Sequence, residues 1–168
     1  GAICMPVAVL FLIMPEVVAF FAAPTYHMML TKSPSWVPIF IAAFLPSLLL
    51  IASGHIPIAP VVSIPAGIVA ALIAKQGSYK SFKWNTISHM VFSWNLFGGF
   101  IPIWVMRDYF FQDTFERGMS QEFCDTLRAL TPWWVLPVMM IATALCSLLG
   151  SLFTKKVLNK HLTKAGVL

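Results

Sequence analysis

The sequence predicts an all-α protein, a multi-pass bundle of membrane-spanning helices that forms a single domain over residues 1–168. Hydrophobic residues make up 59% of the chain and charged residues only 10%, whereas a soluble domain has about 45–50% and about 25%. The apolar residues also gather in runs of the length needed to cross a bilayer, about 20 residues. This composition excludes a soluble globular domain and a disordered chain.

Five apolar runs define five expected spans. They cover residues 6–28, 36–53, 58–74, 84–106 and 132–153. Polar turns rich in proline, glycine or lysine separate them, and residues of these kinds interrupt helices. The longest separator covers residues 106–131, and a basic tail covers residues 154–168.

The charges are divided between alternate separators. All eight lysines lie in the first and third separators and in the tail, whereas all three arginines and five of the six acidic residues lie between Arg107 and Thr131. Cytoplasmic loops carry the excess of positive charge. We therefore expect a cell-membrane protein with a cytoplasmic C-terminus, and with the 54–57 turn and the 106–131 loop outside.

On this topology the first span begins outside the cell. The simplest way to complete the topology is one further helix upstream of Gly1. We therefore expect six spans in the natural protein, with both termini inside.

The outer loop has its own periodicity. Phe111, Phe115, Phe123, Leu127 and Leu130 recur at helical spacing with charged residues between them. This pattern predicts an amphipathic helix that lies on the membrane surface or caps the bundle.

Polar residues within the spans are candidate functional groups, because they are costly in a bilayer. Glu16 could bond to a neighbouring helix or contact a substrate. Asn85, His89 and Ser93 share one helix face, and for Asn85 and His89 we favour hydrogen bonds between helices. Asn95 lies nearer the outside, where a structural role and a ligand role both remain open.

The outer ends of the spans combine aromatic and polar groups. An interfacial belt explains the tryptophans, but it explains the adjacent Arg107 and Asp108 less well. A small flat ligand could stack on tryptophan and bond to the polar groups. The candidate substrate-binding residues are Glu16, His55, Asn95, Trp104, Arg107, Asp108 and Trp133.

No catalytic or metal-binding motif is present. The sequence lacks His-Glu-x-x-His, Gly-x-Ser-x-Gly and a phosphate-binding Gly-Lys-Ser/Thr loop. Three scattered cysteines do not form a zinc site or a disulfide framework. We expect a protein that is not an enzyme and has no cofactor, and any ATP-driven activity would require a partner chain.

Four strings stand out along the chain, GSYKSFKWN at 77–85, PIWVMRDYF at 102–110, LTPWWVLP at 130–137 and KHLTKAGV at 160–167. Together they resemble the Trep_Strep family of bacterial membrane proteins, which are similar to substrate-binding S components of energy-coupling factor (ECF) transporters.

The resemblance implies six helices, capture of a vitamin or precursor near the outer side, and assembly with an ECF T component and two ATP-binding subunits. The aromatic outer rim favours a flat heteroaromatic substrate, with hydroxymethylpyrimidine or pyridoxine as the first expectation. S components commonly dock through AxxxA on their first helix. Ala19 and Ala23 have that spacing but lie in what counts as the family's second helix, so the docking role is not transferred to them.

Three other functions are possible for a small membrane protein. A self-sufficient secondary transporter would need intramembrane carboxylates and often an internal repeat, yet only Glu16 qualifies and no repeat is visible. A membrane enzyme lacks catalytic groups. A purely structural subunit would bind no heteroaromatic ligand.

The charge division generates a topology prediction. A cysteine placed at Lys80 should react with a membrane-impermeant maleimide only after the cells are opened, and cysteines at Asp113 and Glu122 should react in intact cells. Labelling is measured in a background that lacks the native cysteines. Reaction of the Lys80 position from outside would contradict the topology.

Overall fold

The computed structural model describes residues 4–55 and 57–164, and gives the backbone alone for Cys4 and for residues 158–164. The described residues form nine α-helices and one 3-10 helix. They are α1 (Cys4–Leu12), α2 (Met14–Lys32), α3 (Trp36–Ala52), α4 (Ala59–Gln76), α5 (Phe82–Phe92), η1 (Ser93–Gly99), α6 (Pro102–Val105), α7 (Arg107–Glu116), α8 (Gln121–Leu130) and α9 (Val135–Lys164).

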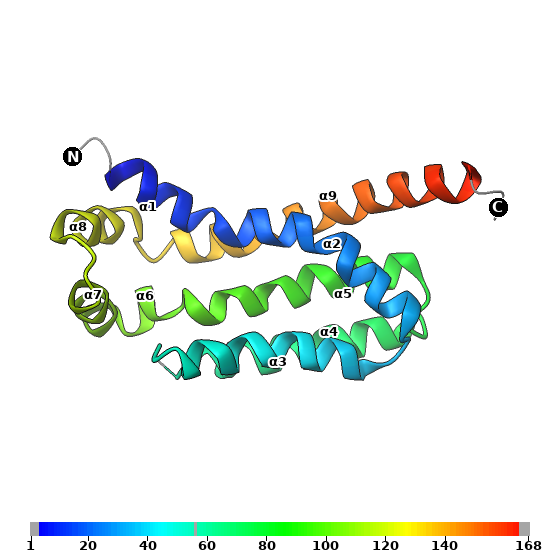
Figure 1. The fold of residues 1–168 in the computed structure, drawn as a ribbon, viewed down its shortest axis with the longest axis horizontal. Helices are drawn as coiled ribbons and strands as arrows, with labels where there is room; N and C mark the ends of the chain where they lie inside the picture. The colour runs from blue at the N-terminus through cyan, green and yellow to red at the C-terminus, as the bar shows by residue number, and fades with distance from the viewer. Residues whose placement is uncertain (1–3, 56, 165–168) are drawn as a thin grey trace.

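The long helices form an elongated bundle, and α7 and α8 lie across one end of it (Figure 1). The main packing pairs are α2 with α9, α3 with α4, and α4 with α5. The α5 helix also packs on α9, and α8 packs on α1. The chain therefore has a membrane-like bundle and a separate helical cap.

The five apolar runs predicted five spans, but fewer helices in the structure are long and apolar enough to cross a membrane. Among the described residues, α4 and the Val135–Val157 part of α9 are long and apolar enough to cross a bilayer. The α1–α2 pair becomes a third candidate if it is counted as one bent span, and α3 is a shorter apolar helix. The C-terminal span also continues as helix into the expected tail, to Lys164.

The first expected span is bent by 41° between Met5–Leu12 and Met14–Lys32. Pro15 occupies the first turn of α2 and is buried. Because proline has no N–H and its ring clashes with the preceding turn, a bend at this point has a local cause.

The fourth expected span, residues 84–106, is not one helix, because it divides into α5, η1 and α6. Two side chains bond to carbonyls at the end of α5. The Ser93 hydroxyl donates to the His89 carbonyl at 2.9 Å, and Asn95 Nδ2 donates to the Phe92 carbonyl at 2.6 Å. The Gly98–Gly99 pair and Pro102 then disfavour a regular α-helix. Hydropathy alone does not detect this break.

Small residues allow α2 and α9 to pack closely. Ala19 and Ala23 are completely buried, and an added Cβ at Gly150 would lie 2.4 Å from the Phe20 carbonyl oxygen and 3.0 Å from the Ala23 Cβ. The AxxxA pair therefore faces the inside of the bundle, consistent with withholding a docking role from it.

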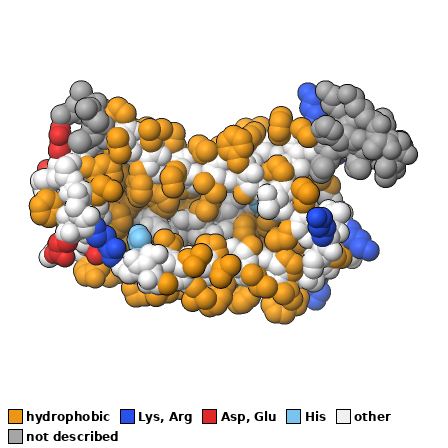
Figure 2. Space-filling view, viewed as in Figure 1, with side chains coloured by type: hydrophobic (Ala, Val, Ile, Leu, Met, Phe, Trp, Pro, Cys, Tyr) orange, Lys and Arg blue, Asp and Glu red, His pale blue; other side chains and the backbone are white. Residues whose placement is uncertain are grey.

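The two ends of the bundle differ in charge (Figure 2). Hydrophobic side chains cover the middle, blue lysine side chains mark the right-hand end, and red acidic side chains gather at the left-hand end together with blue arginine side chains. The acidic end carries α7 and α8 (Figure 1). The division of charge along the sequence therefore corresponds to a division in space.

Gly150→Ala should destabilise the protein, because the new methyl group meets the α2 backbone rather than a flexible side chain. We expect a loss of about 1–3 kcal/mol, the usual cost of overpacking, measured by unfolding in mixed micelles. Gly99→Ala is the matched control, because its Cβ would meet only Leu50 Cδ1 at 3.6 Å. Equal stability of the two variants would contradict the close α2–α9 packing.

Candidate functional site

The cap consists of two helices where one amphipathic helix was expected. Gly118 has φ +95°, a left-handed conformation that favours glycine and ends α7. The Ser120 hydroxyl then accepts a hydrogen bond from the Phe123 N–H at 3.2 Å and caps the start of α8. These two residues fold the outer loop back on itself.

The inner face of the cap is apolar and well packed. Phe111, Phe123, Cys124 and Leu127 are buried in one cluster, and Phe123 meets Phe11 of α1 edge to face at 6.4 Å. Four of the five periodic residues of the outer loop, Phe111, Phe123, Leu127 and Leu130, therefore pack in this cluster.

Arg107 fastens the end of α8 to the start of α7. Its guanidinium donates to the Thr131 carbonyl at 2.7 Å and also to the Arg128 carbonyl. A cation at a helix C-terminus satisfies carbonyls that lack partners within the helix. Arg107 and Arg128 both also lie over the Phe111 ring, at 5.6 and 4.8 Å.

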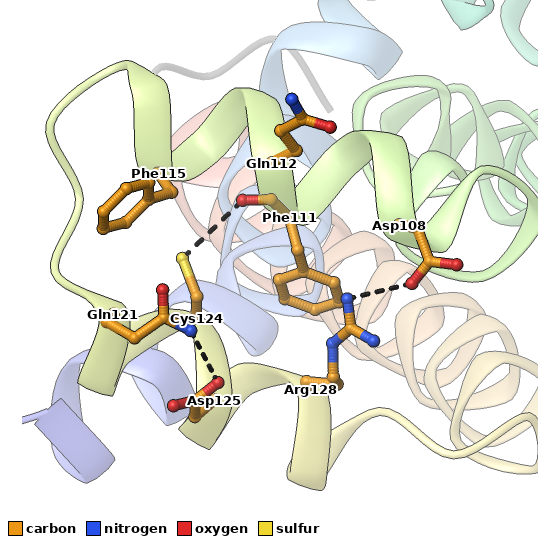
Figure 3. Close-up of a pocket in the computed structure, with 8 residues that line it drawn as sticks. All are labelled: Asp108, Phe111, Gln112, Phe115, Gln121, Cys124, Asp125 and Arg128. Atoms are coloured by element: carbon orange, nitrogen blue, oxygen red, sulfur yellow. Dashed lines mark hydrogen bonds and ion pairs between the residues drawn. The ribbon is translucent and has the colours of Figure 1, made fainter.

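An outer groove of about 440 Å³ lies between α7 and α8 (Figure 3). Small-molecule sites are usually about 300–1,000 Å³, so this groove has room for a small ligand. Its lining is Asp108, Phe111, Gln112, Phe115, Gln121, Cys124, Asp125 and Arg128.

The outer groove offers aromatic surface together with polar groups of both signs. Asp108 Oδ1 pairs with Arg128 Nη2 at 3.0 Å, and Gln121 Nε2 donates to Asp125 Oδ1 at 3.0 Å. The Asp108 side chain is 92% exposed, so it has capacity for further hydrogen bonds. Phe115 is half exposed and provides a ring on which a flat ligand could stack.

The groove also contains a thiol, but an unreactive one. Cys124 is buried and its Sγ lies 3.9 Å from the Phe111 carbonyl oxygen. Burial raises the pKa of the Cys124 thiol, and the negative charge of Asp125 raises it further, while Arg128 acts in the opposite direction. This shift favours the protonated thiol, which is a weaker nucleophile than the thiolate.

Asp108 lines the outer groove, whereas the other predicted site residues lie elsewhere. Trp104 is buried and donates from Nε1 to the Pro132 carbonyl at 3.1 Å, so both it and Arg107 hold the cap together. Trp133 is 63% exposed at the surface. Glu16 lies in the first turn of α2 and accepts a hydrogen bond from Thr143 of α9 at 3.3 Å.

Asn95 and His55 line two smaller cavities beside the broken helix. The Asn95 cavity holds about 80 Å³ and the His55 cavity about 30 Å³, and both are bounded by Leu50 and Ala59. Arg117 closes this region by donating to the Gly54 carbonyl and to Asp113 Oδ2, the latter at 2.7 Å. Both cavities are smaller than a vitamin-sized ligand requires.

The sequence expectation missed most of the outer groove. Phe115 was assigned to an amphipathic face, and Gln112, Gln121, Asp125 and Arg128 were not proposed as site residues. Gly118 followed by Ser120 is the signal that could have found them, since a helix stop and an N-cap imply two helices facing each other.

A buried polar cluster joins α2, α5 and α9 in the lysine-bearing half. Tyr26 and Ser88 share a hydrogen bond of 2.6 Å, and Ser88 also donates to the Ala70 carbonyl at 2.6 Å. His89 is fully buried and its Nδ1 lies 3.4 Å from Ser151 Oγ. Asn85 bonds to the Tyr79 carbonyl at 2.9 Å within its own connection. His89 therefore makes the expected contact between helices, whereas Asn85 holds a turn.

An all-α bundle with large hydrophobic side chains exposed along α1 to α4 and α9 defines a helical integral membrane protein. The chain belongs to the Trep_Strep family, whose profile matches residues 1–164 and is described as a hypothetical bacterial integral membrane protein. No curated protein and no solved structure matches the chain.

Proposed function

We propose that the protein is the substrate-binding S component of an ECF-type importer and captures a small water-soluble vitamin or precursor in the outer groove. The observation that carries this proposal is the groove itself. It is of ligand size, lies in the acidic cap and is lined by both aromatic and polar groups. The resemblance of the four sequence strings to this transporter class adds independent support.

The lining favours a flat heteroaromatic ligand with hydroxyl donors and ring-nitrogen acceptors. Asp108 and Asp125 can accept hydrogen bonds, the amides of Gln112 and Gln121 can donate or accept them, and Phe115 can stack. Hydroxymethylpyrimidine and pyridoxine both fit this description. We propose that uptake is driven by a T component and two ATP-binding subunits, because this sequence contains no phosphate-binding loop.

The proposal places the acidic cap outside the cell and the lysine-bearing end in the cytoplasm, following the charge bias of membrane proteins. The outer groove is then open to the medium from which a vitamin is captured. Mass spectrometry of small molecules released from the purified protein tests the ligand class directly. Release of a lipid-soluble molecule alone would contradict it.

Asp108→Asn and Asp125→Asn should each weaken binding of the released ligand about tenfold, since each removes a charged acceptor, and tenfold corresponds to about 1.4 kcal/mol. Glu122→Gln is the matched control on α8, because Glu122 does not line the groove. Titration calorimetry measures the three affinities. If Asn95→Ala weakens binding while both aspartate variants bind normally, the ligand occupies the two smaller cavities beside the broken helix instead.

A self-sufficient secondary transporter is the second candidate, and buried ionisable groups favour it. Glu16 Oε2, His27 Nε2 and His89 Nε2 are buried without a hydrogen-bond partner among the described residues. Ionisable groups of this kind inside a membrane mark proton or ion pathways in many transporters.

Uptake by the lone chain separates the two candidates. In vesicles containing only this protein, we expect binding of the released ligand but no accumulation, with or without internal ATP. Adding a T component and ATP-binding subunits should make accumulation depend on ATP. Accumulation driven by a pH gradient in the lone chain, and lost in Glu16→Gln, would instead establish the secondary transporter.

A further inference from the structure

A second hollow lies at the other end of the bundle, between α3 and α4. This α3–α4 groove holds about 600 Å³ and has largely apolar walls. Trp36 and Phe40 form one wall, and Ile68 and Leu72 lie on the other. Because Gly67 lacks a side chain, the two helices meet closely below the groove, where an added Cβ would lie 2.7 Å from the Ala43 Cβ.

The groove ends in polar and aromatic groups on the lysine-bearing side. Lys75, in the last turn of α4, and Tyr79 both line it, and Trp36 begins α3 on the same side. Lysine, tyrosine and tryptophan are the residues that settle at the boundary between lipid tails and headgroups. The groove therefore runs from a membrane boundary into the apolar layer.

The charge at this end lacks an internal counterpart. Five of the six acidic residues lie between Asp108 and Asp125, in the cap at the opposite end, and the sixth is Glu16 near the start of α2. Lys155 lies over the Phe82 ring at 5.3 Å and Lys83 over Trp84 at 5.9 Å. No acidic side chain therefore lies at this end to pair with Lys75.

The turn that places Tyr79 in the groove is strained. Ser78 and Tyr79 have φ values of 51° and 60°, so two successive residues other than glycine adopt the left-handed conformation. The Tyr79 N–H donates to the Ala74 carbonyl and Asn85 Nδ2 donates to the Tyr79 carbonyl, both at 2.9 Å. Strain that the surrounding bonds maintain is typical of ligand sites.

We propose that the α3–α4 groove binds one anionic phospholipid, with an acyl chain along the groove and the phosphate on Lys75. The Tyr79 hydroxyl can donate a second hydrogen bond to the headgroup. Basic sites between membrane helices on the cytoplasmic side bind anionic headgroups in this way. An apolar helix of a partner protein would fill the groove but would leave Lys75 without a negative charge.

Native mass spectrometry of the protein released from nanodiscs tests this site. The nanodiscs contain equal amounts of phosphatidylglycerol and phosphatidylcholine with the same acyl chains. The wild-type protein should retain one phosphatidylglycerol. Lys75→Gln should reduce the lipid-bound fraction about fivefold, the effect of one lysine at a membrane surface, and Ile68→Trp should do the same by filling the groove.

Lys80→Gln is the matched control, because Lys80 lies in the same connection but does not line the groove, and it should retain the lipid. Equal retention of both lipids, or equal loss in the Lys75 and Lys80 variants, would overturn the proposal. If Ile68→Trp keeps the phosphatidylglycerol but no longer assembles with partner subunits, the groove receives a protein helix instead. All variants are first checked for wild-type unfolding temperature.

Discussion

The structure depends on one constraint, that backbone N–H and C=O groups surrounded by lipid must find partners within the protein. Continuous helices such as α4 and α9 meet it without side chains. The break after α5 meets it with side chains, because Ser93 and Asn95 bond to carbonyls at the end of that helix. Trp94 Nε1 also donates to the Met140 carbonyl of α9 at 3.0 Å. The irregular backbone is thus satisfied locally and tied to a neighbouring helix.

The same constraint shapes the cap. In the connection from α8 to α9, Arg107 donates to the Thr131 carbonyl, and Trp104 donates to the Pro132 carbonyl, which also accepts from the Val135 N–H at the start of α9. Arg107 and Trp104 were both candidates for ligand binding, but their donors are used to hold α6, α8 and the start of α9 together. In the proposed function, ligand contacts therefore fall to side chains that can accept further hydrogen bonds, of which Asp108 is one.

Sequence patterns predicted the helical membrane class and the amphipathic character of the outer loop, because both follow from composition and period. They predicted one continuous helix over residues 84–106, because a hydropathy average is little affected by Gly98, Gly99 and Pro102. They named Asp108 as a candidate substrate-binding residue together with Trp104, Arg107 and Trp133, and of these four only Asp108 lines the outer groove. The sequence could not show that the Trp104 indole N–H donates to the Pro132 carbonyl, 28 residues further along the chain.

The partners of His89 illustrate the same limit. The i, i+4 spacing placed Asn85, His89 and Ser93 on one face, and the structure buries all three. Which helix they meet depends on the packing of α5 against α2 and α9. The spacing could not predict that Tyr26 of α2 packs against this face, where its ring centroid lies 4.8 Å from that of His89.

The separation of charge between the two ends also makes the bundle an electric dipole. The cap carries five carboxylates against three guanidiniums, a net charge of −2, while the opposite end carries only lysines. In the proposed orientation, the negative interior of a cell stabilises this arrangement. Moving one elementary charge through 100 mV costs about 2.3 kcal/mol. Any reorientation that carried the cap toward the cytoplasm would therefore work against the membrane potential, and the work would grow as the cell became more energised.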